Sequence, residues 1–103
     1  MKLIVLTAVA SYDKDIMQLL KSNKIPQFSY QKVVGYRDST LEGVSSNWFA
    51  SEMNESESIL FFAFVPESSV DPLLQAVDQF NDELKAESKV HLFVSPIEKH
   101  SKL

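Results

Sequence analysis

The sequence predicts a small α+β domain in which four strands and two helices follow in the order β-α-β-β-α-β. Strand-like apolar segments recur at four places, and two other stretches carry apolar residues at helical spacing. The chain has 103 residues, of which 45% are hydrophobic, so it can build one core. These observations together favour a single domain over residues 1–103.

The first half of the pattern begins with a strand at Lys2–Val9, which is rich in Leu, Ile and Val. Ser11 is a suitable N-cap for a helix over about Tyr12–Ser22. The apolar stripe of this helix consists of Ile16, Met17, Leu19 and Leu20. Pro26 cannot continue a helix, so the segment ends before it.

The second strand is expected over Gln27–Tyr36, where apolar and polar residues alternate. Its apolar positions are Phe28, Tyr30, Val34 and Tyr36. The polar stretch Arg37–Ser58 has little periodicity and predicts a loop of about twenty residues. A loop of this length in a compact domain is usually either functional or disordered. Ile59–Val65, "ILFFAFV", is the third strand.

A second helix is expected to begin near Ser69 or Asp71 and to run to about Ala86. Its helically spaced apolar residues are Val70, Leu73, Leu74, Val77, Phe80 and Leu84. Lys89–Ser95 gives the fourth strand. This order is the split βαβ, or ferredoxin-like, arrangement: an antiparallel four-stranded sheet with both helices on one face.

The third strand raises a question of coverage, because Ile59–Val65 is apolar on both faces. Two helices of this size cover only one face of the sheet. The residues that must fill the two faces between them include Leu3, Val5, Ile59, Phe61 and Phe62. We expect a homo-oligomer of cyclic symmetry that buries the second face.

Composition excludes several classes of function. There is no cysteine, which removes disulfides, thiolate zinc sites and a cysteine nucleophile. The net charge of −4 argues against binding to nucleic acid. No segment has the length of a membrane span, and we expect a cytoplasmic protein. No nucleophile motif, metal-water site or phosphate loop is present, so we expect no enzymatic activity.

Three stretches resemble the P-II signalling superfamily in order and spacing. "VVGY" (Val33–Tyr36) is similar to the stretch that leads into the family's long T-loop. "ILFFAFVPESSVDPLLQAV" is similar to its strand, turn and second helix, and "SKVHLFVSPIEK" to its last strand. The resemblance covers nearly the whole chain. It implies a homotrimer, and it implies that residues 37–58 form a T-loop that docks on partners.

The resemblance also indicates where a ligand would bind. Lys89, Arg37 and Lys32 are the cations nearest the expected clefts between subunits, and Gly35 belongs to the same candidate site. The alternative for these cations is a solvated or intersubunit ion pair. The family binds ATP or ADP through a glycine-rich turn before the last strand. Here that turn is "KAESK", without glycine, which makes ATP or ADP binding doubtful.

The loop contains the candidate partner-binding residues Gly43, Trp48 and Phe49. Trp48 and Phe49 either anchor a partner or pack on the oligomer itself. The family resemblance suggests a membrane transporter, for example a metal efflux pump, or a metabolic enzyme as the partner.

The two histidines suggest an alternative function, the binding of a metal ion. His91 is the candidate metal ligand, although an interface role is the simpler interpretation, and His100 fits a surface tail. A metal-binding tolerance protein of CutA type is therefore the alternative function. A structural oligomer without any ligand is the third hypothesis.

Overall fold

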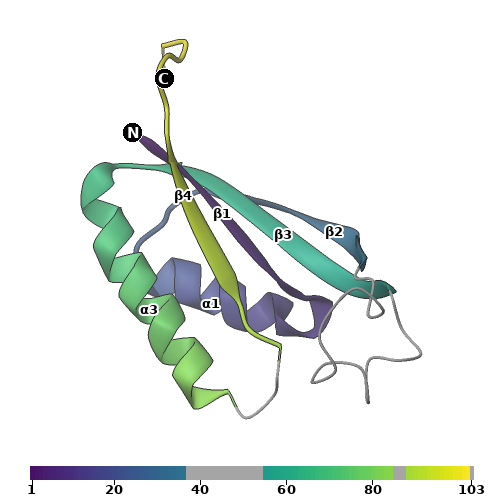
Figure 1. Ribbon diagram of the computed structural model, residues 1–103. Coiled ribbons are helices and arrows are strands. Elements are labelled where there is room, and N and C mark those ends of the chain that lie inside the picture. Colours follow the sequence, from purple (N-terminus) through teal and green to yellow (C-terminus); the bar gives the residue numbers. More distant parts are fainter. Residues whose placement is uncertain (37–54, 85–87, 103) are drawn as a thin grey trace, which may run out of the picture.

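The computed structural model describes residues 1–36, 55–84 and 88–102. Its antiparallel sheet has the order β2-β3-β1-β4, formed by β1 (Lys2–Val9), β2 (Ser29–Tyr36), β3 (Glu55–Val65) and β4 (His91–Pro96). The α-helices of the described residues are α1 (Asp13–Ser22) and α3 (Val70–Glu83), preceded by the 3₁₀ turns η1 (Ala10–Tyr12) and η3 (Glu67–Ser69). The predicted ferredoxin-like order is confirmed (Figure 1).

The core lies between one face of the sheet and the two helices. Every second residue is buried from Ile4 to Ala8 in β1 and from Ile59 to Val65 in β3, as the pleat of a strand allows. Of the apolar positions that helical spacing predicted, Ile16 and Leu20 of α1 and Leu73 and Val77 of α3 are buried. The buried core comprises Ile4, Leu6, Ala8, Ile16, Leu20, Ile25, Ile59, Phe61, Ala63, Val65, Leu73, Val77 and Val90.

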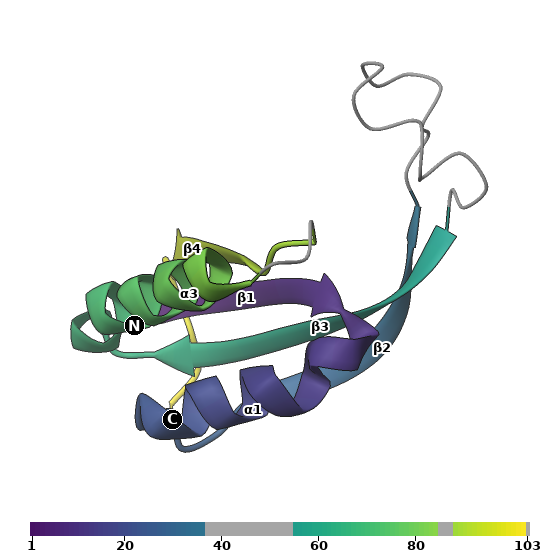
Figure 2. The same ribbon diagram turned by 90° about the horizontal axis from the view of Figure 1, so that it is seen from below.

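Strands β2 and β3 continue beyond the end of β1 as a two-stranded ribbon (Figure 2). The last pair between β1 and β3 is Val9 with Ser58, whereas β2 pairs with β3 as far as Tyr36 and Glu55. The prediction of a loop to Ser58 is therefore wrong by four residues. A two-stranded ribbon is held by its backbone ladder and buries neither face fully, so its sequence need not alternate.

The starts and ends of four elements also differ from the prediction. Strand β2 begins at Ser29 instead of Gln27. Ser11 lies in η1, and Tyr12 is the N-cap of α1 without a side-chain hydrogen bond. Helix α3 ends at Glu83 because Leu84 is extended, and β4 begins at His91 instead of Lys89. The short β4 follows from Asn81, whose side chain occupies both backbone polar groups of Val90.

The other face of the sheet, here called the open face, is covered by neither α1 nor α3 (Figure 2). Residues that pair across antiparallel strands have their side chains on the same face, so the register shows which residues belong to the open face. They are Leu3, Val5, Thr7, Val9, Ser29, Gln31, Val33, Gly35, Ser58, Leu60, Phe62, Phe64, His91, Phe93 and Ser95.

Candidate functional site

Aromatic side chains stand on the open face. Phe62, Phe64 and Phe93 are 37%, 57% and 61% exposed. Phe62 and Phe64 meet edge to face, with ring centroids 6.4 Å apart. With about 200 Å² per phenylalanine, the three residues together present about 300 Å² to solvent. That reaches the lower end of the range for the largest apolar patch of a typical monomer, about 300–600 Å², and such patches are often functional.

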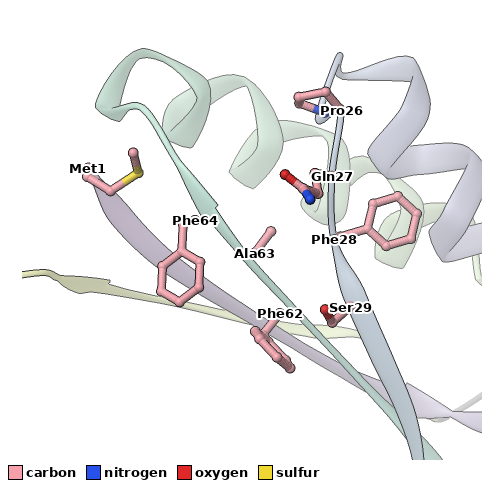
Figure 3. A pocket seen from close by; sticks show the side chains of 8 residues that line it. All are labelled: Met1, Pro26, Gln27, Phe28, Ser29, Phe62, Ala63 and Phe64. Atoms are coloured by element: carbon pink, nitrogen blue, oxygen red, sulfur yellow. The ribbon is translucent and has the colours of Figure 1, made fainter. Parts of the chain in front are cut away.

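A hollow of about 400 Å³ adjoins this aromatic group (Figure 3). It lies at the end of the sheet where β1 begins and β3 ends. Its lining residues are Met1, Pro26, Gln27, Phe28, Ser29, Phe62, Ala63 and Phe64. None of the described residues that line the hollow has a charged side chain, and most of the lining is apolar.

The predicted ligand-binding residues are divided between the two edges of the sheet. Lys32 and Gly35 lie on β2, and Lys89 lies just before β4. Three strand spacings, about 14 Å, separate these edges. All three residues are nevertheless at the same end of the sheet, since Lys32 pairs with Ile59 and His91 pairs with Thr7. One chain therefore does not bring them into a single site.

Lys89 has a defined position. Its Nζ donates a hydrogen bond to the backbone oxygen of Asn81, at 3.0 Å. This carbonyl belongs to the last turn of α3, where a cation is favoured by the helix dipole. The Asn81 side chain donates to the oxygen of Val90 and accepts from its N–H, both at 2.8 Å. Asn81 therefore fixes the backbone next to Lys89.

Arg37 and the candidate partner-binding residues Gly43, Trp48 and Phe49 lie outside the described residues. The same holds for Lys85, Ala86 and Glu87 of the segment "KAESK". The roles of Trp48 and Phe49 therefore stay predictions.

The histidines occupy different surroundings. The ring of His91 is exposed on the open face and stacks on Phe93, with centroids 6.4 Å apart and planes at 25°. His100 is in the tail, where its Nδ1 lies 2.6 Å from the oxygen of Ser101. In residues 1–36, 55–84 and 88–102 no three His, Cys, Asp or Glu side chains are grouped to hold a metal ion.

Solved structures of other proteins share this fold. The chain is similar to a DUF3240 family protein from Shewanella baltica, with TM-score 0.67, 20% identity and coverage of 99% of this chain and 94% of that one. It is also similar to CPII from Thiomonas intermedia bound to ADP, AMP and acetate, with TM-score 0.57, 22% identity and coverage of 91% and 82%.

A second structure of CPII, described as a nitrogen regulatory PII-like protein, contains ADP, AMP and bicarbonate. It gives TM-score 0.58 at 17% identity, over 95% of this chain and 94% of that chain. No protein-family model and no curated protein sequence matches the chain. These likenesses confirm the P-II-like fold that the sequence predicted.

Two features of the site escaped the sequence analysis. Asn81 gave no signal, because an asparagine in the last turn of a helix also fits an ordinary surface position. Val34 and Tyr36 looked like core positions of an alternating strand, yet each is 68% exposed. They lie on the ribbon beyond the end of β1, where neither helix reaches them.

Among the described residues, no helix has the length and apolarity that crossing a membrane requires.

Proposed function

We propose that this chain is a P-II-like regulatory protein that forms a homotrimer through its open face. It binds a small anionic ligand in the clefts between subunits. The segment that connects β2 and β3 then contacts a partner, which is a membrane transporter or a metabolic enzyme. The observation that carries this proposal is the uncovered aromatic face of the sheet.

The energetic case for assembly rests on that face. Burying the exposed part of its three phenylalanines removes about 300 Å² per subunit from water. At about 25 cal/mol per Å², this contributes about 8 kcal/mol per subunit before the entropy of association is subtracted. Each subunit of a cyclic trimer contributes the same surface, so the term is repeated three times.

The division of the candidate residues supports a ligand site between subunits. Lys32 is at the β2 edge and Lys89 is at the β4 edge, at the same end of the sheet. In a cyclic assembly the β2 edge of one subunit can face the β4 edge of the next. Two cations too distant to cooperate within one chain would then converge on one anion.

The class of ligand follows from the chemistry of these residues and from the related structures. Lys32 and Lys89 provide ammonium groups, which suit carboxylate, bicarbonate or phosphate. CPII is described with ADP, AMP and either acetate or bicarbonate, all of which are anions. We therefore place small anions before metal ions as ligands, and no described group of side chains favours the CutA-like alternative.

Isothermal titration against ATP, ADP, AMP, cyclic dinucleotides, bicarbonate and divalent metals tests the proposal. We expect at least one anion to bind with a stoichiometry of one per subunit. Lys32→Ala and Lys89→Ala should each weaken it, whereas Lys102→Ala in the tail should not. No binding across the whole set would contradict the sensing role.

Mixing the two variants tests whether the site is shared between subunits. After unfolding and refolding together, Lys32→Ala and Lys89→Ala chains form mixed assemblies. About a quarter of the clefts then combine an intact β2 edge with an intact β4 edge, and binding should return to that extent. A site contained within one chain would show no recovery.

A further inference from the structure

Asn81, in the last turn of α3, forms hydrogen bonds with two neighbouring residues just before β4. Its side-chain amide donates to the backbone oxygen of Val90 and accepts from the N–H of Val90, both at 2.8 Å. Its backbone oxygen accepts from Nζ of Lys89, at 3.0 Å. One residue of the helix therefore holds both the backbone and the ammonium group at the β4 edge of the sheet.

The two parts of this arrangement differ in burial. Val90 is a core residue and Asn81 is half-buried, so the hydrogen bonds between them are shielded from water. Lys89 is exposed. Its ammonium group has three donors, of which Asn81 accepts one. The other two donors can therefore reach a ligand from a restrained position.

Restraint of a lysine matters for affinity because the free side chain samples many rotamers. Binding must order that side chain, and this ordering weakens the affinity. For Lys89, part of the ordering is complete in the folded chain, since the backbone of the next residue is fixed and the ammonium group already has an acceptor. The bonds to Val90 are the stronger restraint, because they are not exposed to solvent.

We propose that Asn81 is a positioning residue of the anion site, an inference that rests on the ligand site of the proposed function. Asn81 does not contact the anion. It sets the place from which Lys89 presents its remaining donors. Loss of the Asn81 side chain therefore weakens anion binding only through Lys89.

A double-mutant cycle tests this proposal, with AMP and bicarbonate as the probes in isothermal titration. Asn81→Ala should raise the dissociation constant roughly fivefold in the wild-type background. In the Lys89→Ala background the same change should have less than about a twofold effect, because the group that Asn81 positions is absent. Gln79→Ala removes an exposed hydrogen bond on the same helix and is the control, with an expected effect below about twofold in both backgrounds.

Relaxation of the lysine ε-carbons, measured by nuclear magnetic resonance, gives a second readout that needs no ligand. Asn81→Ala should increase the motion of the Lys89 side chain and leave that of Lys102 in the tail unchanged. A merely structural role of Asn81 would weaken binding equally in the two backgrounds, and that result overturns the inference. Unchanged affinity or unchanged motion of Lys89 in Asn81→Ala also overturns it. Circular dichroism checks that each variant is folded.

The outcomes separate this inference from the proposed function. If Lys89→Ala weakens binding as expected and Asn81→Ala does not, only the inference fails. If Lys89→Ala binds as tightly as the wild type, the role of Lys89 in the proposed function is wrong as well. A wild type that binds neither probe overturns the inference, and the wider titration then decides the proposed function.

Discussion

Phe93→Glu should separate the assembly into folded single chains. Phe93 lies on the edge strand β4 and is 61% exposed, so about 120 Å² of it is available for contact with another subunit. Losing that burial costs about 3 kcal/mol per subunit at about 25 cal/mol per Å². An unpaired carboxylate in the interface adds several kcal/mol, and the change occurs in every subunit.

Light scattering during gel filtration measures the mass, and urea unfolding at low concentration measures the stability of the single chain. The substitution should change chain stability by only about 1 kcal/mol, because the ring is mostly exposed in the single chain. Gln75→Glu, on the exposed side of α3, is the charge-matched control and should stay assembled. An unchanged mass for Phe93→Glu would refute the assignment of the open face as the interface.

Three further predictions concern the hydrogen bonds between Asn81 and Val90, the binding of ATP, and the role of Trp48. Asn81→Ala removes two hydrogen bonds to Val90 and should lower the free energy of unfolding, measured in urea, by about 1–3 kcal/mol. The control is Gln79→Ala, which removes one exposed hydrogen bond to Glu83 and should change the free energy of unfolding by less than about 0.5 kcal/mol. ATP should bind more weakly than about 100 μM in competition with a fluorescent analogue, because glycine is missing from the turn before the last strand; tighter binding would show that side chains replace it. Trp48→Ala should leave stability within about 0.5 kcal/mol but weaken partner binding by about 2 kcal/mol, and blue-shifted emission from free wild type would instead indicate packing on the oligomer.

The fold could be predicted from sequence wherever burial imposes a pattern. The strand Lys2–Val9 was located to the residue, and the helices were placed correctly through their apolar stripes. The pattern is weaker where burial is incomplete. Residues Glu55–Ser58 are polar, and the backbone ladder alone holds them in β3, so the sequence suggested a loop.

The candidate site could be predicted only in its residue types. Lys32 and Lys89 were chosen for their charge and for the family resemblance, but the sequence could not show that they occupy opposite edges. The order of strands in the sheet depends on pairing between segments that are far apart in the sequence, and the local apolar pattern of each strand does not determine that pairing. Asn81 was missed for a related reason, since its partner Val90 is nine residues away.

The same geometry links ligand binding to assembly. If the anion site combines Lys32 of one subunit with Lys89 of the next, the separated chain has no complete site. A ligand that binds only the assembled form must then stabilise it, in proportion to the logarithm of ligand concentration. Lys89 already donates one bond to the carbonyl of Asn81, and its ammonium group has two more donors for an anion. Sedimentation at a protein concentration near the dissociation constant should therefore show that the bound anion raises the assembled fraction, and that Lys89→Ala abolishes this effect without preventing assembly at high concentration.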